Sequence, residues 1–167
     1  MNAKAQIIQV PNTLRAKVGG KLGNLDQAAI DKAEAALADL SSHFAEWLMD
    51  EIRKLEERQE RIKQEGYTIE NTESLYYSCH DLKGLGTTYG FPLITRIAGS
   101  LCKMMDDPEK RMEAPRKLVD AHLDAIRAAV RDNIKDTNHP VGKILAETLE
   151  SHVLEYLKKY APEGGAA

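Results

Sequence analysis

The stretch CHDLKGLGTTYGFP, residues 79–92, places glycines inside a segment whose flanks are strongly helical. His80 and Lys83 lie one helical turn apart in it, and three glycines follow the lysine. A glycine in the interior of a helix costs roughly 1 kcal/mol relative to alanine. Each of these glycines therefore needs a structural or functional reason, and the pattern of apolar residues around them supplies one.

A helical wheel of this segment has one apolar stripe, which predicts the face turned toward a core. The stripe consists of Leu75, Cys79, Leu82, Gly86 and Tyr89. On this face Gly86 lets a neighbouring helix approach closely. Gly90 suits the left-handed conformation that closes a helix, and Pro92 suits the first turn of the next one.

The outer face of the same helix is predicted to carry His80 in solvent, nearly opposite the apolar stripe. Lys83 lies at the edge of this outer face and is close enough to His80 to share a ligand with it. Gly84 also lies there, where core packing cannot compensate for its cost. We interpret Gly84 as clearance for another molecule that approaches the imidazole. The other residues of the outer face are Glu73, Tyr76, Tyr77 and Thr87.

An exposed imidazole beside a lysine suits phosphoryl transfer. The imidazole group has an unperturbed pKa of about 6.5, so at pH 7 it is largely neutral and nucleophilic. An ammonium group one turn away can neutralise the negative charge of a transferred group. Phosphoryl transfer asks a protein for positioning and charge stabilisation and for little covalent chemistry beyond that.

The segment HDLKGLGTTYGFPLITRIAGSL resembles the signature of the histidine-containing phosphotransfer (HPt) domains of bacterial two-component phosphorelays. That signature is a histidine, any residue, an aliphatic residue and Lys-Gly, with a further glycine ten residues after the histidine. The matching residues are His80, Leu82, Lys83, Gly84 and Gly90. The resemblance implies a four-helix bundle with the active histidine exposed in the middle of a helix.

The resemblance also implies roles for these residues and for partners. His80 would be the phospho-acceptor, Lys83 the charge-stabilising neighbour, and Gly84 the clearance position. Such domains accept a phosphoryl group from the aspartyl phosphate of one response-regulator receiver domain and pass it to the aspartate of another, downstream of a sensor or hybrid histidine kinase. Mg²⁺ would come from the receiver, and this chain would bind no cofactor. The expected docking residues are Gly84, Thr87, Tyr76 and Tyr77.

Two alternatives stay open. Asp81 follows the histidine where the family usually has a small or neutral residue, and TTYGF also resembles the phosphotransfer modules of chemotaxis kinases. A separate histidine kinase catalytic domain phosphorylates those modules in trans. The second alternative is a helical adaptor that binds receiver domains and never carries phosphate. The chain has no Gly-rich nucleotide box and no room for an ATP-binding domain, so we expect a phosphocarrier rather than a self-sufficient kinase.

Helical periodicity and helix breakers extend the prediction to an all-α protein. Short connections favour antiparallel packing as an up-down four-helix bundle, with an extra C-terminal helix. The expected helices span 26–64, 71 or 72 to 89, 92–105, 115–136 and 141–160. The expected divisions are a basic, partly disordered arm (1–25), the HPt-like bundle (26–136), the additional helix (137–160) and a disordered tail (161–167). The charged end of the first helix, RKLEERQERIKQE, should protrude or be covered on one side only.

Composition narrows the function classes. The net charge is −3 and no basic face dominates, which argues against nucleic-acid binding. No apolar run reaches the roughly 18 residues of a membrane span, and no signal-peptide core is present, so we expect a cytoplasmic protein. The two cysteines have no CxxC spacing and are expected to be buried thiols. The remaining histidines have no partners at metal-ligand spacing, so no metal site is expected.

Overall fold

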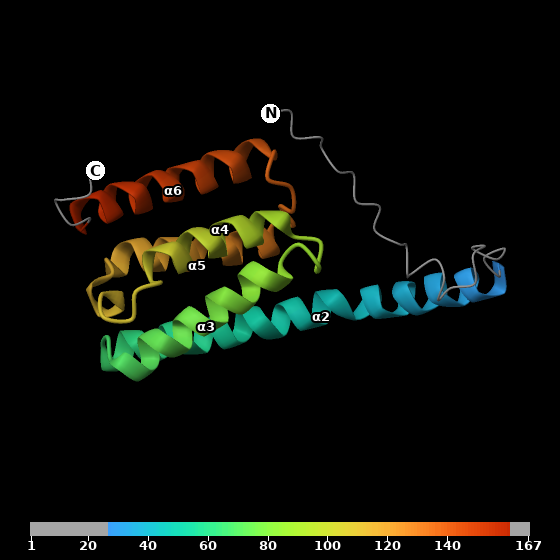
Figure 1. Cartoon of the computed structure of the whole chain (residues 1–167), viewed down its shortest axis with the longest axis horizontal. Coiled ribbons are helices and arrows are strands. Elements are labelled where there is room, and N and C mark those ends of the chain that lie inside the picture. The colour runs from blue at the N-terminus through green and yellow to red at the C-terminus, as the bar shows by residue number, and fades with distance from the viewer. Residues whose placement is uncertain (1–26, 161–167) are drawn as a thin grey trace, which may run out of the picture. The chain divides into compact units, whose positions relative to one another are not determined.

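The computed structural model describes residues 27–160, except for the side chains of Ser42 and Tyr160. Regular structure in this part is entirely helical, which confirms the all-α class (Figure 1). The elements are α2 (Gln27–Glu65), α3 (Ile69–Leu85), α4 (Pro92–Met104), the short 3-10 helix η1 (Arg111–Glu113), α5 (Arg116–Arg131) and α6 (Pro140–Tyr160). None of these helices combines the length and apolar character that crossing a membrane requires. The expected basic arm (1–25) and tail (161–167) lie outside the described residues.

The chain divides into two compact units, residues 1–40 and residues 41–167. In the described part of the first unit, which is the beginning of α2, Leu37 and Leu40 are exposed. In the second unit the apolar stripe of α2 is buried, with Leu48 and Leu55 only 1% exposed. The charged end of α2 is covered on one side, because Ile62 is buried while most of its neighbours are exposed.

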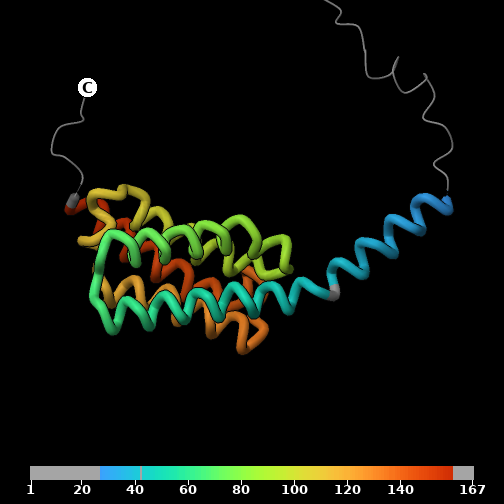
Figure 2. The backbone as a smooth tube through the Cα atoms, turned by 90° about the horizontal axis from the view of Figure 1, so that it is seen from below, coloured from blue at the N-terminus to red at the C-terminus, as the bar shows by residue number. Residues whose placement is uncertain are grey.

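In the second unit, successive helices run in alternating directions, and both views of the backbone show this (Figures 1 and 2). α4 lies at the centre, since it contacts α3, α5 and α6. The core is built mainly of aliphatic side chains from these helices. Its most completely buried members include Leu75, Leu82, Leu93, Ile97, Leu101, Leu123 and Ile126.

α6 is packed closely against α4, although it was expected only as an addition. A Cβ atom placed on Gly142 of α6 would lie 2.7 Å from a methyl group of Leu93, so the Leu93 side chain would have to shift to admit a side chain there. Further along, the Arg96 guanidinium donates to both carboxylate oxygens of Glu150, at 2.7 and 2.6 Å. A bidentate pair of this kind fixes orientation as well as distance.

Three helix boundaries differ from the sequence prediction. α3 begins at Ile69 rather than at residue 71 or 72, because Thr68 is its N-cap. It ends at Leu85 rather than at residue 89, and hydrogen-bonded turns follow as far as Gly90, which has a φ of +80°. α5 ends at Arg131 rather than near residue 136, since Asn133 adopts a φ of +52°, which a helix cannot continue through.

Candidate functional site

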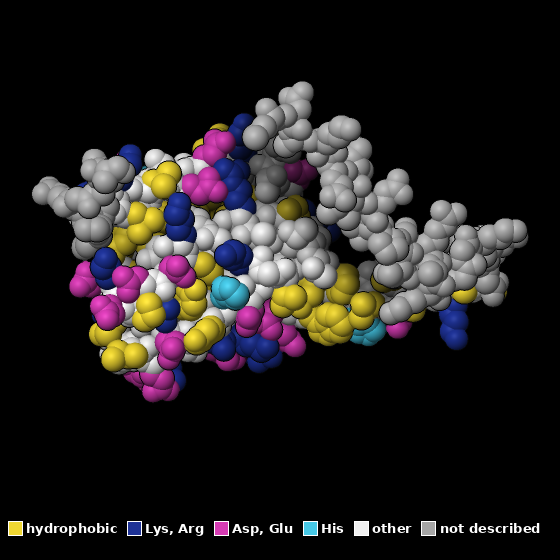
Figure 3. Space-filling view, viewed as in Figure 1, with side chains coloured by type: hydrophobic (Ala, Val, Ile, Leu, Met, Phe, Trp, Pro, Cys, Tyr) yellow, Lys and Arg dark blue, Asp and Glu magenta, His cyan; other side chains and the backbone are white. Residues whose placement is uncertain are grey.

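His80 lies on the outer face of α3 and is exposed to solvent. Figure 3 shows a histidine side chain at the surface over the middle of α3. Within residues 27–160, neither ring nitrogen of His80 makes a hydrogen bond. Burial along α3 confirms the two faces of the wheel, since Leu75, Cys79 and Leu82 are completely buried on the opposite side. The imidazole is therefore held on a rigid element with both nitrogens open to a partner.

Lys83 is also exposed, one turn after His80, and it forms no ion pair in the described part of the chain. Its aliphatic stem lies against α4, because a Cβ atom placed on Gly99 would be 3.8 Å from Lys83 Cγ. The positive charge of Lys83 also acts electrostatically on the Cys102 thiol of α4. Burial raises the pKa of that thiol to about 11, and Lys83 partly opposes the rise. The ammonium group is thus anchored along its stem and available to an anion beside His80.

Gly84 and Gly86 differ in what surrounds them. A Cβ atom on Gly84 would have no atom within 4 Å, so nothing in the described structure requires a glycine there. A Cβ atom on Gly86 would lie 2.7 Å from Thr95 Oγ1 and 2.8 Å from the Thr95 backbone nitrogen. Gly86 is therefore required by the approach of α4, as expected, and the space above Gly84 is open to a second molecule.

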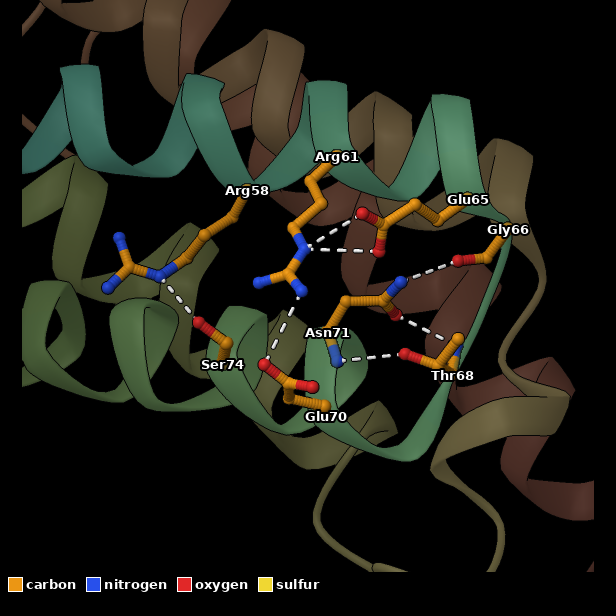
Figure 4. A network of polar contacts seen from close by, with 8 residues as sticks. All are labelled: Arg58, Arg61, Glu65, Gly66, Thr68, Glu70, Asn71 and Ser74. Carbon is orange, nitrogen blue, oxygen red and sulfur yellow. Dashed lines mark hydrogen bonds and ion pairs between the residues drawn. The ribbon is translucent and has the colours of Figure 1, made fainter.

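The start of α3 is tied to α2 by a polar network (Figure 4). Thr68 Oγ1 accepts a hydrogen bond from the Asn71 N–H at 3.2 Å, and the Asn71 side chain accepts one from the Thr68 N–H at 2.9 Å. This reciprocal pair is a capping box. Arg58 of α2 donates to Ser74 Oγ at 2.9 Å, one turn further along α3. These bonds fix the axial position of α3 and hence that of His80.

The end of α3 is tied to α4 through Thr87 and Thr95. Thr87 is exposed, its N–H donates to Thr95 Oγ1 at 2.8 Å, and the two hydroxyl oxygens lie 3.0 Å apart. The Phe91 N–H donates to the Gly86 carbonyl at 2.8 Å. Thr87 thus stabilises the turn after α3, a role that the sequence reasoning did not foresee. The sequence does not mark Thr95 as a partner of Thr87, because their hydrogen bonds depend on how closely α4 approaches the end of α3.

The two tyrosines that were expected on the docking surface differ in environment. Tyr77 is 57% exposed and lies beside Tyr76 in an edge-on ring contact. Tyr76 is half-buried, and its hydroxyl donates to Asp106 Oδ1 at 2.9 Å. That hydrogen bond is the main cause of a raised pKa for Tyr76. Asp106 lies in the connection between α4 and α5, for which the sequence predicts only a break between helices.

Asp81, which directly follows His80, is exposed and forms no ion pair among the residues that the structure describes. Residues 27–160 also contain no group of three or more histidine, cysteine or acidic side chains that could hold a metal ion. Comparisons with protein-family models, with curated proteins and with solved structures found no match to this chain. The function is therefore argued from the geometry of the His80 face.

Proposed function

We propose that the protein is a histidine phosphotransfer protein of a two-component phosphorelay, with His80 as its phospho-acceptor. One observation carries the proposal. An exposed imidazole without hydrogen bonds, an unpaired lysine one turn away and an open space over Gly84 occur together on one helix face. No internal contact of the described chain accounts for that combination, whereas an incoming receiver domain does.

The chemistry needs only these groups and the partner. An unprotonated ring nitrogen of His80 attacks the phosphorus of the receiver's aspartyl phosphate, so that a P–N bond forms while the P–O bond to the aspartate breaks. The aspartate leaves as a carboxylate. Lys83 stabilises the charge on the phosphoryl oxygens in the transition state and in the phosphohistidine. Transfer to a second receiver reverses these steps on another aspartate. The receiver would hold the Mg²⁺ that this chemistry uses.

The arrangement of the second unit supports the fold that this function implies. We propose that α3, α4, α5 and the later part of α2 form an up-down antiparallel four-helix bundle, with α6 packed on α4 and α5. Alternating helix directions favour this topology. So do two hydrogen bonds from α2, from Arg58 to Ser74 of α3 at 2.9 Å and from Gln59 to Asp120 of α5 at 2.6 Å.

Asp81 favours a second candidate, a phospho-acceptor module that a separate histidine kinase catalytic domain phosphorylates in trans. The carboxylate is exposed beside the histidine and unpaired in the described chain, so it is available to activate the imidazole. His80, Lys83 and Gly84 keep their roles in this scheme, and only the phosphate donor changes. The helical adaptor without phosphate is the third possibility. In all three cases we place the protein in the cytoplasm, where receiver domains and kinase catalytic domains act.

The proposal is tested by mixing the protein with receiver domains that carry a labelled aspartyl phosphate. We expect label to move to this chain in an acid-labile, alkali-stable form, as a phosphohistidine requires. His80→Gln should abolish the transfer, whereas His152→Gln, at an exposed histidine of α6, should leave it unchanged. Labelling by a kinase catalytic domain but by no receiver would select the second candidate. If neither donor labels the protein, the adaptor explanation replaces both.

A further inference from the structure

Tyr76 lies one turn before His80 on α3, and the two side chains are neighbours at the surface. Their ring centroids are 6.1 Å apart and their planes are inclined by 37°. This is the only ring contact of His80 within residues 27–160. Because neither ring nitrogen of His80 is hydrogen-bonded there, its orientation depends on sterically close groups. Residues four apart on a helix are such neighbours, so Tyr76 forms one wall of the space that the imidazole occupies.

Tyr76 is itself held from outside α3. Its hydroxyl donates to Asp106 Oδ1 at 2.9 Å, and Asp106 lies just after the end of α4. A hydrogen bond to an ionised acceptor is stronger than one between neutral groups. The bond joins residues far apart in the chain, so it restrains the Tyr76 ring relative to α4 as well as α3.

Arg111 of η1 adds a second restraint on the same ring. The guanidinium carbon lies 4.1 Å from the Tyr76 ring centroid, in cation–π geometry. Arg111 is only 6% exposed and forms no ion pair in the described part of the chain. Its Nε donates to the Met105 carbonyl at 2.8 Å, which fixes the guanidinium in place. The buried guanidinium of Arg111 has no carboxylate partner in the described chain, so its attraction to the Tyr76 ring face offsets part of its desolvation free energy. Breaking this contact would therefore lower stability.

We propose that Tyr76 is a positioning residue for His80, and that Asp106 and Arg111 hold it in that role. The ring of Tyr76 restricts the rotamers of His80, so that a ring nitrogen is presented outward before a partner arrives. Transfer is fast only when the reacting atoms are already aligned, and an imidazole that rotates freely spends part of its time misaligned. The kinetic half of this inference rests on the proposed phosphotransfer function, whereas the orientation of His80 can be measured without phosphate.

The first test compares Tyr76→Leu and Tyr76→Phe with the unmodified protein. NMR coupling constants of the His80 side chain should report one dominant χ1 rotamer in the unmodified protein and averaging between rotamers in Tyr76→Leu. At saturating phosphorylated receiver, the transfer rate of Tyr76→Leu should fall about tenfold or more, with little change in the receiver concentration at half saturation. Tyr76→Phe keeps the ring and loses only the Asp106 bond, so its rate should fall less. Tyr67→Phe, which removes a buried hydroxyl without a hydrogen-bond partner before α3, is the matched control and should keep the normal rate.

A second pair of variants keeps the test valid if Tyr76→Leu does not fold. Asp106→Asn retains an acceptor for the Tyr76 hydroxyl and should preserve both the rotamer and the rate, whereas Asp106→Leu should behave like Tyr76→Phe. An unchanged His80 rotamer distribution in Tyr76→Leu, or an effect only on half saturation, would overturn the inference while the phosphotransfer function stands. Failure of the unmodified protein to take label from any donor would instead remove the proposed function, and the rotamer measurement would still decide the positioning role.

Discussion

The outer face of α3 and the interior between α4 and α5 each contain a histidine, in opposite environments. His122 in the interior is fully buried, and both of its nitrogens are engaged, with Leu118 O at 2.7 Å and Ser100 Oγ at 3.1 Å. His80 on the outer face is exposed and has no such bonds in the described chain. Intramolecular hydrogen bonds explain the first side chain completely and leave the second unexplained. The proposed phosphotransfer function would account for an imidazole that is left open on the outer face of α3.

Gly84 in α3 and Gly86 just after its end repeat this contrast. A Cβ atom on Gly86 would lie 2.7 Å from Thr95 Oγ1, whereas a Cβ atom on Gly84 would meet no side chain or neighbouring helix within 4 Å. Gly84 lies inside α3, where glycine costs roughly 1 kcal/mol relative to alanine, and no packing contact of the described chain compensates for that cost. A residue that lowers helix stability and that no contact of the chain requires therefore indicates a role outside the fold itself.

The largest effect is expected for Gly84→Leu. Leucine favours helix over glycine by roughly 0.5–1 kcal/mol, so the free energy of unfolding should stay equal or rise. The added side chain fills the space beside His80, and phosphoryl transfer from a receiver should fall by about 100-fold or more. Chemical denaturation and transfer kinetics on the same sample measure both quantities. Transfer at the normal rate by a folded Gly84→Leu protein would show that the clearance interpretation is wrong.

Gly86→Ala should have the reverse profile. Its methyl group would clash with the backbone and hydroxyl of Thr95, and overpacking of this kind costs about 1–3 kcal/mol. Urea denaturation should therefore show a clearly lower free energy of unfolding, whereas transfer by the folded fraction should change little. A stability equal to or above that of the unmodified protein would mean that α3 and α4 are not as close as described.

Lys83→Ala should slow transfer by about tenfold, which corresponds to about 1.4 kcal/mol of transition-state stabilisation. Stability should change by less than about 0.5 kcal/mol, because Lys83 is exposed and forms no ion pair in the described chain. Lys83→Arg serves as the control that keeps the charge, and it should recover part of the rate. A large loss of stability in Lys83→Ala would show that its stem along α4 matters more than its ammonium group.

The smallest effect concerns pH and His122. Burial is the main cause of a lowered pKa for His122, so the folded protein keeps this imidazole neutral at pH values where the unfolded chain binds a proton. Below about pH 6.5 the free energy of unfolding should therefore fall with decreasing pH, by at most about 1.4 kcal/mol per pH unit from this group. Titration followed by imidazole NMR should show that the pKa of His122 in the folded protein lies below 6.5, the ordinary value for histidine. A His122 pKa at or above 6.5 would contradict the burial argument.

Much of this fold could be read from the sequence because proline, glycine and apolar spacing agree. The bounds of α4 and α6 lie within a residue of prediction, and α2 is equally close. The helix boundaries that differ from the prediction have specific causes. Asn71 at the third position of α3 completes a capping box in place of the usual Glu or Gln, so the helix starts at Ile69. Asn133, not a glycine, takes the left-handed conformation after α5.

The candidate site also has features that the sequence predicts and contacts that it does not. The exposure of His80, Lys83 and Gly84 follows from helical periodicity alone, and burial in the structure agrees with it. The contacts of Asp106 and Arg111 with Tyr76 could not be predicted, because they depend on the path of the segment between α4 and α5. Charged residues in such a segment are ordinarily solvated, and only the three-dimensional arrangement brings these two to the phenol ring.

In the proposed function, the outer face of α3 transfers phosphate through His80. The most direct measurement is to locate the phosphate by fragmentation mass spectrometry under alkaline conditions, after the protein has been mixed with phosphorylated receiver domains. We expect a single phosphorylated residue, His80, and loss of the modification when an unphosphorylated second receiver is added. Phosphate on any other residue, or no phosphate with any receiver or kinase donor, would contradict it.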